Sequence, residues 1–183
     1  MKIIPIKYSE EKLIEQVKQQ NRLAQKQLYD RFSPSLLSTC RQYIKDIHEA
    51  EDVMLMGFMK IFQNINQFQF AGSFEGWMRR IMIYESIDFI RQKKQITFTE
   101  DVSYKEECHF ENDSLYEVEA IQKLIDDLPE GCKMVFVLSI VEGYKHQEIA
   151  EMLKISVGTS KSQLAHARKL LQERIQLQDK KIL

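Results

Sequence analysis

Residues 143–171, GYKHQEIAEMLKISVGTSKSQLAHARKLL, hold the pattern that decides the fold. Gly143 suits the left-handed position that follows a helix, and Ile149 and Leu153 then recur at helical spacing. Only three residues, 154–156, separate this helix from the next one, for which Ser156 is a candidate N-cap. Two helices joined by so short a turn must cross steeply, so the spacing predicts a helix-turn-helix.

The second helix of this motif has one apolar face and one polar, cationic face. Leu164, Ala167 and Leu171 are expected to close the core, and the stretch from Lys154 to Arg174 carries five basic residues and one acidic residue. The polar face is expected to point outward. Its residues are Thr159, Lys161, Ser162, Gln163, His166, Arg168 and Lys169. Such a face suits a DNA major groove, and the alternative is an ordinary solvated helix.

The composition is that of a globular protein without a strong overall charge. The 183 residues include 26 Lys+Arg, 27 Asp+Glu and 44% hydrophobic residues. The chain has only three prolines and six glycines, so few residues would break a helix. Strand-like alternation is confined to residues 96–99, and we therefore predict an all-α fold. No apolar run is long enough to span a membrane and residues 1–18 lack the apolar stretch of a secretory signal, so we expect a cytoplasmic protein.

The sequence holds no motif for catalysis or metal binding. Cys40, Cys108 and Cys132 form no CxxC pair, and there is neither a Gly-rich phosphate loop nor a Ser-His-Asp arrangement. We therefore expect no enzyme, no metal site, no cofactor and no small-molecule substrate. Cys40 and Cys132 are interpreted as small apolar core residues.

The first part of the chain is predicted to be a bundle of helices. Ser9 caps the first, in which Leu13, Ile14 and Val17 share a face. A second helix carries Leu23, Leu28 and Phe32. Ser33 and Pro34 are interpreted as the start of a separate third helix, because proline is favoured at a first helical position. Residues 49–65 form the next helix.

Residues 66–73, NQFQFAGS, are predicted to be a loop that carries two aromatic rings, Phe68 and Phe70. Ser73 then caps a long helix over residues 74–94, whose stretch from Arg79 to Lys94 has five basic and two acidic residues. One stripe of that helix holds Trp77, Ile81, Tyr84, Asp88 and Arg91. Aromatic rings beside cations suit single-stranded nucleic acid, and the alternative is that the rings belong to the core.

An acidic segment follows. Between Glu100 and Glu130 there are eleven acidic residues and two lysines, and helical periodicity is weak before Leu115. We predict a domain over residues 1–95, an acidic flexible linker over 96–115 and a second domain over 116–183.

Three stretches resemble sigma-70-family RNA polymerase sigma factors of the extracytoplasmic-function (ECF) subgroup. LPEGCKMVFVLSIVEGYKHQEIAEMLKISVGTSKSQLAHARKLL (128–171) is similar to sigma region 4. AEDVMLMGFMKIFQNINQF (50–68) is similar to region 2.2, and FEGWMRRIMIYESIDFIRQKK (74–94) to regions 2.3 and 2.4. Their order and spacing match, across a linker too short for a region 3 domain.

The resemblance implies a non-enzymatic subunit that binds core RNA polymerase and directs it to promoter DNA. It implies polymerase contacts from Glu51, Asp52, Leu55, Met56, Lys60 and Asn64. It implies reading and opening of the −10 element, with a flipped base in the loop, by Phe68, Phe70, Ser73, Trp77, Arg79, Arg80, Tyr84, Asp88 and Arg91. It implies −35 contacts from Ser156, Thr159, Lys161, Ser162, Gln163, Ala165, His166, Arg168 and Lys169.

The resemblance also implies that the acidic linker threads the RNA-exit side of polymerase and that an anti-sigma factor, often membrane-bound, regulates the protein. The sequence departs from the family pattern at four places: apolar Leu55 and Met56 where Gln and Glu are frequent, Tyr84 for Asn, Lys145 for a capping Ser, and Gln163 and His166 for Arg. Glutamine pairs well with adenine and arginine with guanine, so the −35 preference is expected to shift.

From the residues alone, two other functions stay open. One is a stand-alone DNA-binding regulator that uses the helix-turn-helix, expected as a dimer on a palindrome. The other is a helical interaction protein without a nucleic-acid role, for which the apolar residues Leu55, Met56 and Met59 are the reason.

Overall fold

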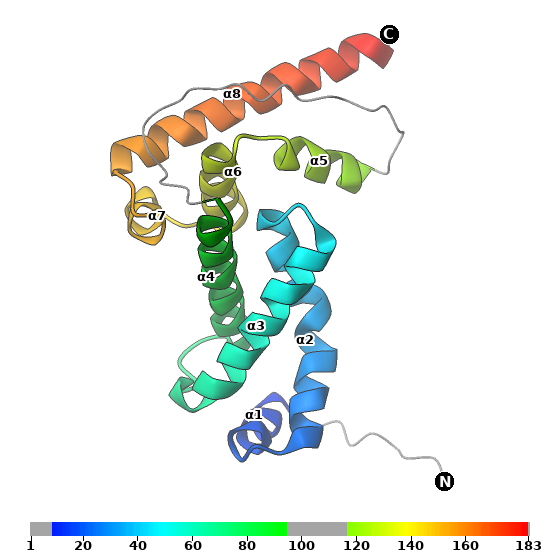
Figure 1. Ribbon diagram of the computed structural model, residues 1–183, viewed down its shortest axis with the longest axis vertical. Coiled ribbons are helices and arrows are strands. Elements are labelled where there is room, and N and C mark those ends of the chain that lie inside the picture. The colour runs from blue at the N-terminus through cyan, green and yellow to red at the C-terminus, as the bar shows by residue number, and fades with distance from the viewer. Residues whose placement is uncertain (1–8, 95–116, 183) are drawn as a thin grey trace. The chain divides into compact units, whose positions relative to one another are not determined.

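The computed structural model describes residues 9–94 and 117–182, and every regular element within them is a helix (Figure 1). The prediction of an all-α fold is therefore confirmed. The chain divides into two compact units, residues 1–89 and 90–183. The predicted linker, 96–115, lies outside the described residues, so the proposed domain boundaries stay a prediction.

The first unit is built from α1 (Glu10–Lys18), α2 (Arg22–Tyr43), α3 (Ile47–Asn64), the 3-10 turn η1 (Ile65–Gln67) and α4 (Phe74–Lys94) up to residue 89. Side chains cap the helices, because Ser9, Asn21 and Asp46 accept hydrogen bonds from the first backbone N–H groups of α1, α2 and α3. Figure 1 shows α3 with α2 on one side and α4 on the other. Leu23, expected on the apolar face of α2, is 72% exposed in its first turn.

Helix α2 runs through Pro34 without a break, which corrects the prediction that a separate helix begins there. A proline inside a helix cannot donate to the carbonyl four residues earlier, and this costs about 3 kcal/mol or more. Burial offsets the cost, because Phe32 before the proline and Leu36 after it lie on the same buried face. Packing of the whole face keeps the helix continuous.

Aromatic rings hold the core of this unit together. Tyr29 of α2 lies 4.8 Å from Phe58 of α3, and Phe32 lies 6.0 Å from Phe74 of α4, measured between ring centroids. Burial raises the pKa of the Cys40 thiol to about 11, so this thiol stays protonated at neutral pH. Cys40 and Cys132 are both buried, as predicted.

Gly57 allows α3 and α4 to approach closely. A β-carbon at this position would lie 2.2 Å from Sδ of Met82 and 2.8 Å from its Cε, and Met82 is fully buried. We expect Gly57→Ala to lower the free energy of unfolding by about 1–2 kcal/mol, because overpacking outweighs the better helix propensity of alanine. The fluorescence of the only tryptophan, Trp77, reports on this unit during denaturant unfolding.

Gly76 provides the matched control for that substitution. Its β-carbon would meet only the side chain of Ser73, at 3.5 Å or more, which is ordinary contact. Gly76→Ala is expected to leave stability unchanged or slightly raised. Equal losses from both alanine substitutions would show that the approach of Met82 is not the cause.

The second unit contains α5 (Glu117–Asp126), α6 (Glu130–Phe136), the π-helical turn η2 (Val137–Val141), α7 (His146–Leu153) and α8 (Val157–Ile182). Helices α5, α6 and α7 all pack against α8, and Figure 1 shows them along its length. Gly143 adopts a φ of 78° after η2, as predicted for a residue that ends a helix. None of the helices within the described ranges is long and apolar enough to cross a membrane.

Candidate nucleic-acid and polymerase interfaces

The predicted helix-turn-helix is formed by α7, residues 154–156 and α8. Lys154 ends α7 in the left-handed conformation, with a φ of 56°. The N–H of Ile155 donates to the carbonyl of Ala150 at 3.0 Å, which fixes the direction of the turn. Ser156 caps α8 as expected, since its Oγ accepts from the N–H of Thr159 at 2.9 Å.

A polar contact joins the two helices of the motif. Nδ1 of His146, at the start of α7, lies 2.8 Å from Oγ of Ser160, which is buried in α8. Lys145 gives α7 no side-chain cap, as expected for a lysine at this position. Instead the carboxylate of Glu148 accepts from the backbone N–H of Lys145 at 2.8 Å. The start of α7 is thus held without a capping serine.

The outward face of α8 is short, polar and cationic. Its exposed members are Ser156, Lys161, Ser162, Ala165, Arg168 and Lys169. Lys161, Ala165 and Arg168 follow at spacings of four and three residues, so they line one strip of the helix. Lys169 lies 3.9 Å from Glu173 in an exposed ion pair. We define Lys161, Ser162, Ala165, Arg168 and Lys169 as the α8 outer face.

Thr159 does not belong to this face, which corrects the sequence prediction. It is 6% exposed, and its Oγ1 lies 2.8 Å from Oγ of the capping Ser156. Gln163 and His166 are half-buried at the edge of the face. The side chain of Gln163 lies against Gly131 of α6, where a β-carbon would come within 2.8 Å of Nε2. Its Oε1 is buried and finds no hydrogen-bond partner among the described residues.

The predicted loop begins two residues later than expected, because residues 66 and 67 belong to η1, and residues 68–73, the aromatic loop, divide their two rings between the core and the surface. Phe68 is 5% exposed and packs on Phe74 and Trp77, at centroid distances of 5.0 and 5.7 Å. Phe70 is 46% exposed and has a left-handed φ of 57°. Ser73 caps α4 as predicted, because its Oγ accepts from the N–H of Gly76 at 3.2 Å. The core interpretation therefore holds for Phe68, whereas the exposed ring of Phe70 leaves its role in nucleic-acid binding a prediction.

The predicted −10 residues of α4 differ in their exposure. Arg80, Tyr84 and Asp88 are exposed, and Trp77, Arg79 and Arg91 are half-buried. The guanidinium carbon of Arg80 lies 5.8 Å from the centroid of the Tyr84 ring. The exposed strip of α4 thus combines an aromatic ring with a cation.

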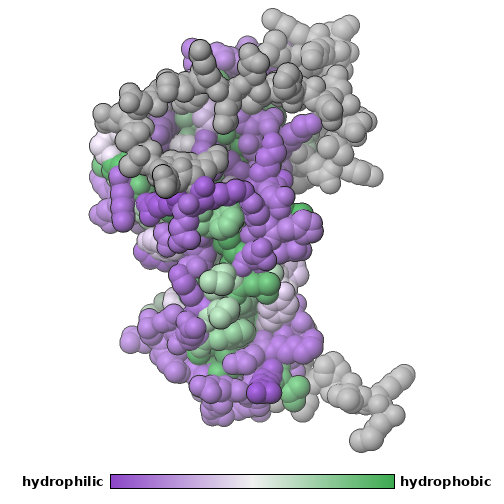
Figure 2. All heavy atoms as spheres, in the orientation of Figure 1, coloured by the Kyte–Doolittle hydropathy of each residue, from purple (hydrophilic) through white to green (hydrophobic). Residues whose placement is uncertain are grey.

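The predicted polymerase-binding residues lie on the outward side of α3. Leu55 and Met56 of the predicted set are 48% and 54% exposed, and they adjoin Met59, which is 56% exposed and was not among the predicted polymerase contacts. Figure 2 shows hydrophobic side chains gathered over α3. The rest of the predicted set surrounds them: Glu51, Asp52 and Lys60 are exposed and Asn64 is half-buried. Lys60 forms an ion pair with Glu85 of α4.

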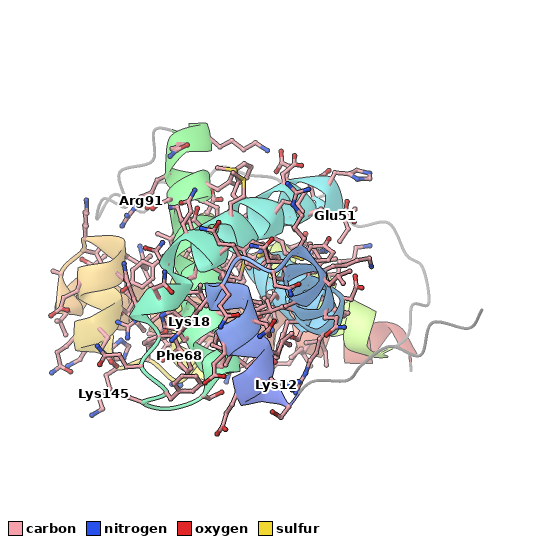
Figure 3. All side chains as sticks on the ribbon, turned by 90° about the horizontal axis from the view of Figure 1, so that it is seen from below. Lys12, Lys18, Glu51, Phe68, Arg91 and Lys145 are labelled. Atoms are coloured by element: carbon pink, nitrogen blue, oxygen red, sulfur yellow. The ribbon has the colours of Figure 1, made fainter. Side chains whose placement is uncertain are left out.

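One contact of the loop was missed by the sequence predictions. Nζ of Lys18, the last residue of α1, donates to the backbone carbonyl of Phe68 at 2.9 Å. Figure 3 shows the two residues next to one another. They are 50 positions apart in the chain, so no local pattern could have revealed the contact.

Comparison with known families matches both units. The family model described as sigma-70 region 2 matches residues 28–96, and the model described as sigma-70, region 4 matches residues 118–171. Together they cover more than half of the chain. The chain belongs to the ECF group of the sigma-70 family. Sigma factors are non-catalytic transcription initiation factors, and the function of this one is promoter recognition together with core RNA polymerase.

Several sigma factors resemble it along most of their length. The ECF RNA polymerase sigma factor SigW of Bacillus subtilis is 28% identical over 178 residues, which are 90% of this chain and 95% of SigW. The ECF RNA polymerase sigma-E factor of Haemophilus influenzae is 26% identical over 182 residues, which are 92% and 96% of the two chains. These matches span both units of this sigma factor.

Two solved structures share its fold. The sigma factor RpoE of Bartonella quintana, in complex with the anti-sigma factor NepR, aligns with a TM-score of 0.55 at 20% identity, over 82% of this chain and 96% of that one. CnrH, in complex with the cytosolic domain of CnrY, aligns with a TM-score of 0.51 at 21% identity, over 90% and 96%.

Proposed function

We propose that this sigma factor divides promoter recognition between its two units. The α8 outer face contacts the −35 element, while the aromatic loop and the outer side of α4 read and open the −10 element. The observation that carries the proposal is the separation of exposed cations on α8 from its buried apolar side, on a helix-turn-helix of region 4. Thr159 has no part in it, because its side chain is buried.

We further propose that α3 docks this sigma factor on core polymerase. Leu55, Met56 and Met59 expose apolar surface, which suits burial against a partner. Met56→Glu is expected to weaken co-elution with core enzyme by about tenfold or more, because binding would bury a charge. Run-off transcription from a cognate promoter is expected to fall in parallel.

Leu23→Glu is the matched control for that variant. Leu23 is 72% exposed on α2 and lies outside the set on α3, so its replacement is expected to leave polymerase binding unchanged. Full activity of the Met56 variant would contradict the docking role of α3. Failure of the native chain to bind any bacterial core enzyme would contradict the proposed function as a whole.

Regulation by an anti-sigma factor is also proposed. Both solved structures are complexes with a protein partner, RpoE of Bartonella quintana with the anti-sigma factor NepR and CnrH with the cytosolic domain of CnrY. A membrane-associated anti-sigma factor is the form that we expect here. Affinity purification of the full chain from its native cells, with and without salt washing, tests whether such a partner co-purifies and blocks polymerase binding.

His166 offers a gain-of-function test of the proposed −35 contact. It is half-buried at the edge of the α8 outer face. His166→Arg is expected to tighten binding to the −35 element, because one more phosphate is neutralised. The plot of log K against log salt concentration is therefore expected to become steeper by about 0.9. Promoter titrations of the holoenzyme between low and moderate salt measure that slope.

Gln172→Arg is the control for the His166 variant. It adds the same charge to an exposed position of α8, but six residues further along and about 120° around the helix. A smaller change in the salt slope is expected from it. A salt slope for His166→Arg equal to that of the native chain would show that position 166 does not face DNA.

A further inference from the structure

The exposed ring of the aromatic loop is held in an unusual backbone conformation. Phe70 has a φ of 57°, a region that residues with a β-carbon rarely occupy. Gly72, two residues later, has a φ of 104°, which glycine adopts readily. Something besides local preference must therefore keep Phe70 in place with its ring 46% exposed.

Lys18 makes two contacts that can do this. Its Nζ donates a charge-assisted hydrogen bond of 2.9 Å to the carbonyl of Phe68, and it lies 4.9 Å from the centroid of the Phe70 ring. The same ammonium group thus contacts the backbone of Phe68 and the ring of Phe70, the two neighbours of residue 69. Figure 3 shows Lys18 at the end of α1 beside the loop.

Helix α1 itself is firmly anchored. Leu13, Ile14 and Val17 are all at most 3% exposed, and α1 packs against α2 and η1. The lysine is therefore presented to the loop from a fixed support and is half-buried there. A cation held on such a support loses little further entropy when DNA binds.

We propose that Lys18 is a positioning residue for −10 recognition: it holds the loop so that Phe70 displays its ring to an unpaired base. The proposal rests on the proposed function of the loop and adds α1 to the −10 machinery. Helix α1 lies before residues 28–96, to which the region 2 model is matched. Bases stack on exposed aromatic rings irrespective of their identity, and a cation beside the ring also favours the adjacent phosphate.

The test uses the full chain assembled with core enzyme on a promoter that carries 2-aminopurine in the −10 element. Lys18→Met is expected to reduce the yield of open complex by about tenfold, which is about 1.4 kcal/mol, whereas core binding and −35 affinity stay within twofold. Lys18→Arg is expected to recover most of the yield, because a guanidinium can make both contacts. Lys26→Met removes the same charge from an exposed ion pair with Asp30 and is expected to have no effect.

A second template separates positioning from simple destabilisation. On DNA with an abasic site at the position of the flipped base, native chain and Lys18→Met are expected to give equal yields, because the ring then has no base to meet. A difference that persists on this template would overturn the proposal, as would failure of Lys18→Arg to rescue. If Phe70→Ala lowers the yield and Lys18→Met does not, the loop reads the −10 element without Lys18. If Phe70→Ala has no effect either, the −10 function of the loop itself is wrong.

Discussion

Replacement of both Lys161 and Arg168 by alanine is expected to lower the affinity of the holoenzyme for a −35-dependent promoter by about 100-fold or more. Each side chain is an exposed cation on the same strip of α8, and loss of one base or phosphate contact typically costs about 1–3 kcal/mol. The slope of log K against log salt concentration is expected to become shallower as well, by up to about 0.9 for each cation lost. Competition binding at several salt concentrations measures both quantities.

Two exposed lysines of the first unit provide the control for this double variant. Lys12→Ala with Lys26→Ala removes the same charge from α1 and α2, outside the α8 outer face. This control is expected to change promoter affinity only slightly. A control variant that weakens binding as much as the α8 variant would point to non-specific attraction, and full affinity of the α8 variant would remove α8 from the proposed −35 interface.

The helix-turn-helix was predictable because its signals are local. Ser156, Gly143 and the apolar spacing of α7 and α8 each act within a few residues, and the structure has the cap, the left-handed glycine and the three-residue turn where they were expected. The same holds for Ser9 and Ser73, whose side chains cap α1 and α4. Periodicity also identified buried residues of α1, α7 and α8, but it did not identify the buried face of α4.

Local signals failed where tertiary packing or a nearby polar group decides the outcome. Pro34 was interpreted as a helix start, but burial of Phe32 and Leu36 keeps α2 continuous through it. Thr159 was placed on the DNA-facing side by helical spacing alone. In the first turn of α8 it instead turns toward its capping serine.

Long-range contacts account for what the sequence could not reveal about the candidate site. Lys18 reaches the loop across 50 positions of the chain, and Gln163 rests against Gly131 of another helix. Periodicity assigns a side chain to a face but not to a partner. The division between the buried Phe68 and the exposed Phe70 likewise depends on Phe74 and Trp77 of α4.

Breaking a buried ion pair is expected to lower the free energy of unfolding of the second unit more than any surface substitution does. Nζ of Lys133 donates to Oδ1 of Asp126 at 2.7 Å, and the two side chains are 6% and 3% exposed. Lys133→Met is expected to reduce the stability of this unit by about 3–5 kcal/mol, because it removes one partner of a buried ion pair and leaves the Asp126 carboxylate buried. Gln122, which donates to the same oxygen at 3.2 Å, cannot replace a full charge.

The single tryptophan makes this effect measurable unit by unit. Trp77 lies in the first unit, so its fluorescence during urea unfolding is expected to change little in the Lys133 variant, whereas the loss of helical circular dichroism shifts to lower urea. Combining Lys133→Met with Asp126→Leu removes both charges, and apolar replacement of a whole buried pair is often neutral. The double variant is therefore expected to recover most of the stability. If it is as unstable as the single variant, shape rather than charge explains the loss, and a single variant as stable as wild type would show that the pair contributes nothing.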